Sequence, residues 1–156
     1  MRPHSRVGVL ALVLAIGCNA CFLVPPPRSA YMPIHRYARD GDAASVEADL
    51  TANPKDLNLP DDARRTPLHL AAAHCHADVV AILLNKGAAA NRKGAGGATA
   101  LHLAAQEGCI DVVIILVARG SKVNARDDAR RTPLKRSEEW HQDAVAEFLR
   151  EHGGRE

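Results

Sequence analysis

One short stretch of the sequence carries side chains that bind metals or exchange electrons. His74, Cys75 and His76 are consecutive, and Cys109 lies 34 residues after Cys75. Neutral imidazole and thiolate are good ligands for zinc or copper, and two thiols can join as a disulfide. These residue types therefore allow a metal or redox accessory protein. The four cysteines of the chain are spaced too irregularly for a paired CxxC zinc site or a disulfide scaffold.

His69 and His102 invite a catalytic interpretation, because imidazole titrates near neutral pH. No nucleophile or carboxylate recurs at a matching spacing to complete a triad with either of them. The sequence also has no phosphate-binding loop and no paired-carboxylate site. We therefore expect no enzyme activity, no cofactor and no small-molecule substrate.

Charged side chains gather in an octapeptide, DDARRTPL, which occurs at residues 61–68 and again, unchanged, at residues 127–134. Its Asp and Arg side chains form either a solvated rim or a row of contacts to a partner. The chain has 20 Lys and Arg against 18 Asp and Glu, for a formal net charge of +2. This excess is too small to indicate binding to nucleic acid through bulk electrostatics.

The elements that position these residues follow from an internal repeat. TPLHLAA at residues 66–72 returns as TALHLAA at residues 99–105, and a third copy begins with TPL at residues 132–134, each 33 positions on. Thr suits a helix N-cap and Pro the first helical position. In the middle copy, a second apolar helical pattern covers residues 111–117 and stops at Gly120. Each block therefore predicts two short helices and a projecting turn, here called a finger.

A 33-residue period built on TPLHLAA resembles the ankyrin repeat, and the resemblance covers residues 32–154. It implies an all-α solenoid of about four helix-turn-helix repeats, with two full repeats between two capping repeats. The implied boundaries are an N-capping repeat at 32–65, full repeats at 66–98 and 99–131, and a C-capping repeat with a tail at 132–156.

The resemblance also implies roles for individual residues. His69 and His102 become structural groups that tie one finger to the next helix and to the capping threonine. Ankyrin-type repeats bind other proteins along one strip formed by the finger tips and the exposed side of the first helices. In this sequence the implied partner-binding strip contains Asp62, Arg65, His74, Lys93, Gln106, Glu107, Arg126, Asp128, Arg131, Glu139 and Trp140.

Some positions depart from the family pattern. Arg64 and Arg130 replace a glycine that the family often has, which Gly97 retains in the middle finger. If the backbone there has a positive φ, each arginine costs about 1 kcal/mol. In the last repeat, the LAA triplet becomes RSE at residues 136–138, which we interpret as a polar outer face. Trp140, the sole tryptophan, is either a lid over the last hydrophobic layer or a binding anchor.

Alignment of the repeats bears on the cysteines. Cys75 takes the position that Gly108 fills in the next repeat, whereas Cys109 aligns with His76. Stacked helices lie about 8 to 10 Å apart, and the Cα atoms of bridged cysteines are rarely more than about 7 Å apart. We therefore expect Cys75 and Cys109 to be buried or half-buried free thiols.

The N-terminus has the layout of an export signal. Residues 1–6 carry two arginines and no acid, and residues 7–24 carry no charge. AIGC at residues 15–18 resembles a bacterial lipobox, which implies a signal peptide at 1–17, a lipidated Cys18 and a Pro-rich tether up to residue 31. An uncleaved membrane anchor and an ordinary cleaved signal peptide, which would release a secreted protein, are the alternatives.

Together these features predict an exported, lipid-anchored module that faces the periplasm and binds another protein. The alternatives are the metal or redox accessory protein described above and an immunity-type inhibitor of a toxin enzyme. Cleavage before Cys18 would remove Arg2 and Arg6, leaving 18 basic against 18 acidic residues. The cleaved chain would therefore be neutral.

Overall fold

The computed structural model describes residues 33–156, so the predicted signal peptide, Cys18 and the tether lie outside the described residues. Paired helices make up most of the described chain. They are α1 (Pro33–Asp40) with α2 (Ala43–Ala52), α3 (Pro67–Ala73) with α4 (Ala77–Asn85), α5 (Ala100–Glu107) with α6 (Ile110–Ala118), and α7 (Pro133–Glu139) with α8 (Asp143–Glu151). Two short 3-10 helices, η2 (Pro54–Asn58) and η3 (Ala95–Gly97), lie in the connections.

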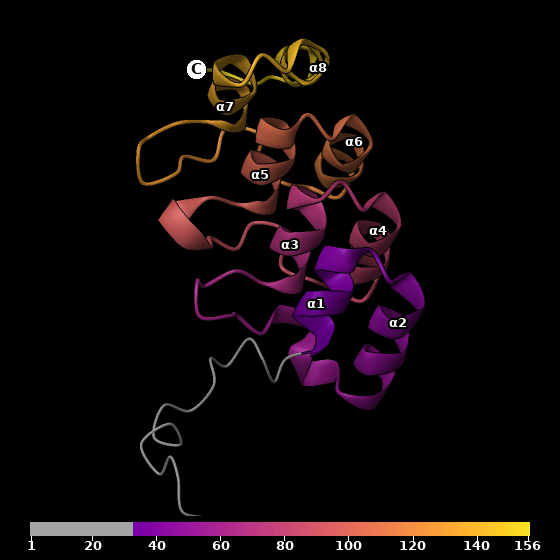
Figure 1. The fold of residues 1–156 in the computed structure, drawn as a ribbon. Helices are drawn as coiled ribbons and strands as arrows, with labels where there is room; N and C mark the ends of the chain where they lie inside the picture. Colours follow the sequence, from indigo (N-terminus) through magenta and orange to yellow (C-terminus); the bar gives the residue numbers. More distant parts are fainter. Residues whose placement is uncertain (1–32) are drawn as a thin grey trace, which may run out of the picture.

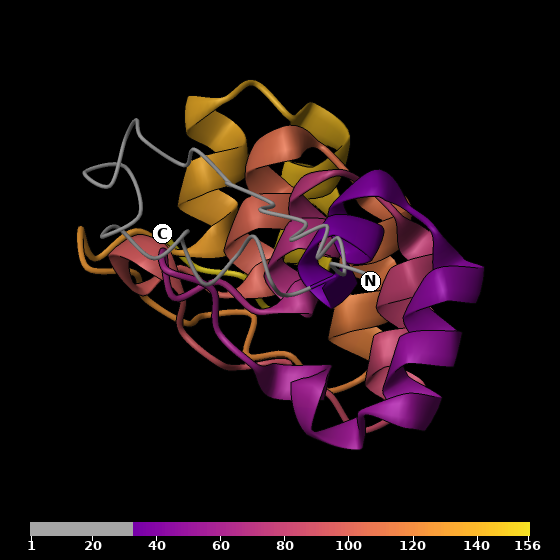
Figure 2. The same cartoon turned by 60° about the horizontal axis from the view of Figure 1, so that its bottom comes forward.

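The helices stack in two rows (Figure 1). The first row runs α1, α3, α5 and α7, the second runs α2, α4, α6 and α8, and each helix packs on its pair and on its neighbours in the row. The loops that precede α3, α5 and α7 project to the same side of the stack, beyond the first row (Figure 1). They contain the first, second and third fingers, at residues 59–65, 92–98 and 125–131. Seen from below, they again lie on one side, away from the second-row helices (Figure 2). The predicted all-α solenoid is confirmed.

Local sequence explains where the helices begin. Thr66 and Thr99 precede α3 and α5 with extended backbone, at φ near −90°. Each is part of a capping box in which the third helical residue is a histidine rather than the usual glutamate. Thr132 caps α7 by accepting a hydrogen bond from the Lys135 backbone N–H. A β-hydroxyl at this position thus starts three first-row helices.

The core between the rows is thin and built from small side chains. In the described chain it consists of Leu, Ile, Val and Ala side chains together with Cys109. Ala71, Ala72, Ala104 and Ala105 are all fully buried. Because alanine adds little bulk, the first-row helices can pack closely without aromatic side chains between them. This packing accounts for the low aromatic content of 3%.

Asparagines join each repeat to the next through the same bond. Asn58, Asn91 and Asn124 each accept a hydrogen bond through Oδ1 from a backbone N–H 31 residues later, at 2.8, 2.7 and 2.7 Å. The side-chain amides of Asn91 and Asn124 also donate to Gly120 O and Gly153 O. We call this series the asparagine ladder. It fixes the spacing between repeats on the side where the second helices end.

Between residues 33 and 156, none of the helices has both the length and the apolar character required to span a bilayer.

Candidate functional site

His69 and His102 lie at the base of the fingers and are buried. His69 Nδ1 lies 2.8 Å from Thr66 Oγ1, and its Nε2 lies 3.2 Å from Ala98 O in the next finger. His102 repeats the arrangement with Thr99 Oγ1 at 2.9 Å and Arg131 O at 3.0 Å. The structural role predicted for both histidines is confirmed.

The same contacts determine the protonation of the two rings. Burial lowers the pKa of His69 and of His102 below 6.5, although the backbone carbonyls that their Nε2 atoms contact act in the opposite direction. Backbone N–H groups of Thr66 and Thr99 donate to the Nδ1 atoms, so the proton of each neutral ring is on Nε2. Both rings are therefore neutral at pH 7 and enclosed by the protein.

A buried carboxylate closes the first finger and another closes the third. Asp61 accepts hydrogen bonds from the Arg65 backbone N–H at 2.7 Å and from Arg65 Nε at 2.9 Å. Asp127 accepts the equivalent bonds from Arg131 at 2.8 and 3.0 Å. Burial by itself raises the pKa of each carboxyl, but the bonds and charges of the arginines outweigh it, so both pKa values fall below 3.8. Arg65 and Arg131, predicted for partner binding, thus also hold their own fingers closed.

Arg136 is a buried charged side chain that joins α7 to the rest of the stack. The polar outer face predicted for residues 136–138 is wrong at two positions, because Arg136 is only 7% exposed and Ser137 is fully buried. Arg136 Nη2 lies 2.8 Å from Asp127 Oδ2, and Nη1 donates to Gln106 Oε1 at 3.0 Å. The side chain therefore points back into the stack and links α7 to α5 and to the third finger. Its alignment with Leu70 and Leu103, which are core-type residues, is the signal that could have placed it.

Replacing Arg136 separates the contribution of its volume from that of its charge. R136A is expected to lower the free energy of unfolding by about 2 to 3 kcal/mol, because it leaves a cavity and removes a buried ion pair. R136L is expected to cost less than about 1.5 kcal/mol, because leucine fills the space and is the residue at the equivalent position 70. In that repeat Asp61 is bound by Arg65 alone, so a second arginine is not required. Urea unfolding measures both. Equal losses would contradict this account.

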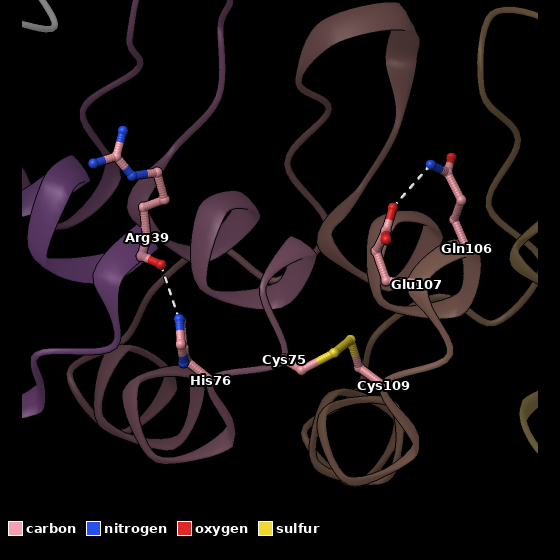
Figure 3. The surroundings of a disulfide bond; sticks show 6 residues. All are labelled: Arg39, Cys75, His76, Gln106, Glu107 and Cys109. Carbon is pink, nitrogen blue, oxygen red and sulfur yellow. Dashed lines mark hydrogen bonds between the residues drawn. A yellow bond between two sulfur atoms is a disulfide. The ribbon is translucent and has the colours of Figure 1, made fainter.

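The structure corrects the prediction for the cysteines. Cys75 and Cys109 form a disulfide, with their Cα atoms 5.1 Å apart (Figure 3). The distance of about 8 to 10 Å applies to the axes of stacked helices, but neither cysteine lies within a helix. Cys75 occupies the left-handed turn between α3 and α4, and Cys109 is the N-cap of α6. These turns approach each other more closely than the axes, so the free-thiol prediction is wrong.

The disulfide removes two of the four donors proposed for a metal. Both thiols are bonded to each other, and His76 Nε2 contacts Arg39 O at 2.8 Å (Figure 3). Residues 33–156 contain no group of three or more His, Cys, Asp or Glu side chains placed to hold a metal ion. The metal form of the accessory-protein hypothesis therefore has no set of ligands in this part of the chain.

The predicted partner-binding strip lies on the fingers and on the first-row helices. Most of its side chains are exposed, namely Asp62, Arg65, His74, Lys93, Glu107, Arg126, Asp128, Glu139 and Trp140, whereas Gln106 and Arg131 are half-buried. Neighbouring fingers are joined by Lys93 Nζ, which donates to Arg126 O at 2.8 Å. Nine side chains of the strip are thus exposed to solvent, and Arg65, Lys93 and Arg131 also stabilise the fingers.

Trp140 ends α7 and is 55% exposed. A side chain that covers the last hydrophobic layer would be mostly buried, so this exposure disfavours the interpretation of Trp140 as a lid. Its use as a binding anchor stays a prediction.

Arg64 and Arg130 are exposed finger residues that the predicted strip does not include. Their φ values are 61° and 62°, and Gly97 at the same repeat position has φ 69°. The predicted left-handed backbone is confirmed, at a cost of about 1 kcal/mol for each arginine. The identical DDARR sequence of the two fingers was the signal that both arginines recur together.

Comparison with known proteins agrees with this geometry. The family described as Ankyrin repeats (3 copies) matches residues 34–127, which is more than half of the chain. Human Ankyrin repeat domain-containing protein 7 is 42% identical over 53 residues, which make up 34% of this chain and 21% of that protein. The matched region thus represents about a fifth of the human protein's length.

Proposed function

Because the chain belongs to the ankyrin-repeat family, whose members generally act as protein-binding modules, we propose that it binds a partner protein through the fingers and first-row helices. The observation that carries this proposal is the set of exposed side chains on the fingers and first-row helices, which lie on one side of the stack. It spans three fingers and ends at Trp140, a residue type that often carries interface energy.

The proposal includes export and anchoring through Cys18. The uncharged run at residues 7–24 behind two arginines, and the lipobox-like AIGC, support an acylated N-terminus. The Cys75–Cys109 disulfide gives independent support, since disulfides persist mainly in oxidising compartments such as the periplasm. A triacylated cysteine would hold the module on its membrane.

Site-specific photo-crosslinking tests the binding surface. A photoreactive amino acid at position 128, on the third finger, should yield a discrete crosslinked protein. The matched control is position 114 on α6, where Ile114 is 42% exposed but lies in the second row. The same species from both positions, or none from position 128 and from position 62 on the first finger, would overturn the assignment of the strip.

Mass spectrometry of the mature N-terminus tests the anchor separately. A triacylated Cys18 supports the lipoprotein, whereas an intact Met1 contradicts it. The outcome is independent of the binding test, because the repeats and the export segment are different parts of the chain.

A further inference from the structure

Arg64 and Arg130 occupy the same backbone position in the first and third fingers, and this shared position carries the inference. We propose that their guanidinium groups recognise carboxylates on an acidic segment of the partner protein. The proposal rests on the protein-binding function proposed above and names the chemistry of the partner.

The backbone at this position favours glycine. All three fingers have positive φ there, and the middle finger uses Gly97. A glycine adopts this conformation without strain, whereas an arginine does not. Left-handed backbone in non-glycine residues is concentrated at functional sites, where the strain is retained because the side chain is needed.

The fold has no evident use for these two side chains. Both are exposed, and neither forms an ion pair with another residue in the described region. The buried carboxylates of their fingers, Asp61 and Asp127, form ion pairs with Arg65, Arg131 and Arg136 instead. The backbone N–H groups of Arg64 and Arg130 donate within the finger at 2.9 Å, and Gly97 makes the equivalent bond at 3.1 Å without a side chain. The arginine side chains are therefore available to another molecule.

The exposed charge of the fingers is predominantly basic. The exposed basic side chains there are Arg64, Arg65, Arg92, Lys93, Arg126 and Arg130, against two exposed acids, Asp62 and Asp128. Many acids of the chain lie instead on the second-row helices, among them Glu47, Asp78, Asp111, Asp143, Glu147 and Glu151. The chain is close to neutral as a whole, but its fingers carry an excess of exposed cations, whereas the exposed acids Glu107 and Glu139 of the strip lie on the first-row helices.

The chemistry favours carboxylates on a protein over a nucleic-acid backbone. A guanidinium binds a carboxylate with two parallel hydrogen bonds, which gives direction as well as charge. Asp62 and Asp128 lie within the same fingers and would repel a continuous run of phosphates. An acidic protein segment can leave gaps opposite these aspartates.

The test uses the full chain and a fluorescein-labelled peptide of defined length in which pairs of glutamates alternate with Gly-Ser spacers, here called poly-glutamate. Its binding is followed by fluorescence anisotropy at low salt. The double variant R64G/R130G should weaken binding at least fivefold, while the midpoint of urea unfolding stays the same or rises. The control K55Q/K86Q removes two exposed positive charges that lie next to the C-terminal ends of α2 and α4, outside residues 59–65, 92–98 and 125–131 of the fingers. It should change binding less than twofold. R64K/R130K keeps the charge but loses the two-bond geometry, so its binding should be intermediate.

Each remaining outcome overturns the inference in a recognisable way. Unchanged binding by R64G/R130G, or a clear fall in its unfolding midpoint, would show that the arginines have another role. Tighter binding to a single-stranded oligonucleotide of equal charge than to poly-glutamate would replace the acidic protein with nucleic acid. If the wild-type chain does not bind poly-glutamate but a crosslink still forms from position 128, only the acidic nature of the partner is contradicted. If no crosslink forms from position 128 or from position 62, the protein-binding function itself is contradicted.

Discussion

Reduction of the Cys75–Cys109 disulfide is expected to lower the free energy of unfolding by about 3 to 4 kcal/mol. The bond closes a loop between residues 34 apart in sequence, and this loop length sets the loss of entropy that it imposes on the unfolded chain. The bond also joins the α3–α4 turn to the start of α6, so it links the two central repeats. Without it, these repeats are held together by packing and hydrogen bonds alone.

Urea unfolding with and without dithiothreitol measures the effect. The matched control is C75A/C109A, which retains a Cβ at position 75 and hence the cost of φ 60° there. This variant also keeps Cys18 and Cys21, so it reports any effect of the reductant at those positions. It should be insensitive to dithiothreitol and close in stability to the reduced wild type. A wild-type protein whose stability does not change on reduction would contradict the prediction.

Acid is expected to destabilise the stack in a window that begins near pH 6.5. The folded pKa values of His69 and His102 are lowered from 6.5, with burial as the main cause. As pH falls below 6.5, the unfolded chain binds protons that the folded chain does not, so stability falls until the folded pKa values are reached. Each histidine contributes up to about 1.4 kcal/mol per pH unit, and the two together up to about 2.7. Asp61 and Asp127, whose pKa values are below 3.8, add a separate loss at lower pH.

The experiment compares unfolding free energies between pH 7.5 and pH 5 for the wild type and for H69Q. Glutamine does not titrate in this range, so H69Q should lose about half of the pH dependence, whatever its stability at pH 7.5. If the slope of H69Q equals that of the wild type, His69 is not a titrating group in this window.

Positions that recur at the repeat period could be predicted from the sequence alone. The threonine and histidine pairs 66–69 and 99–102 occur in the same local context, so one set of local rules applies to both. The left-handed backbone at Arg64 and Arg130 follows from Gly97 at the same position. In each case the contacts are short-range or reach only the adjacent finger, and the period specifies that neighbour.

Positions where the repeat is broken could not be predicted in this way. Cys75 and Cys109 are 34 residues apart, one more than the repeat period, so they do not occupy equivalent positions. Their proximity depends on how closely two turns approach each other rather than on the separation of helix axes. The burial of Arg136 depends on Asp127, whose carboxylate faces α7 with room for a second arginine. A single sequence shows that these residues are exceptions but not what each of them contacts.

The asparagine ladder also bears on how the molecule folds. Its bonds span 29 or 31 residues, and the longest-range side-chain hydrogen bond in the described chain joins residues 37 apart. Each repeat is therefore fixed by its immediate neighbours, which is the condition for a nearest-neighbour, one-dimensional folding process. Any adjacent pair of repeats can act as the nucleus, and the remaining repeats can then add outward one at a time. Contacts of such short sequence separation also favour rapid folding.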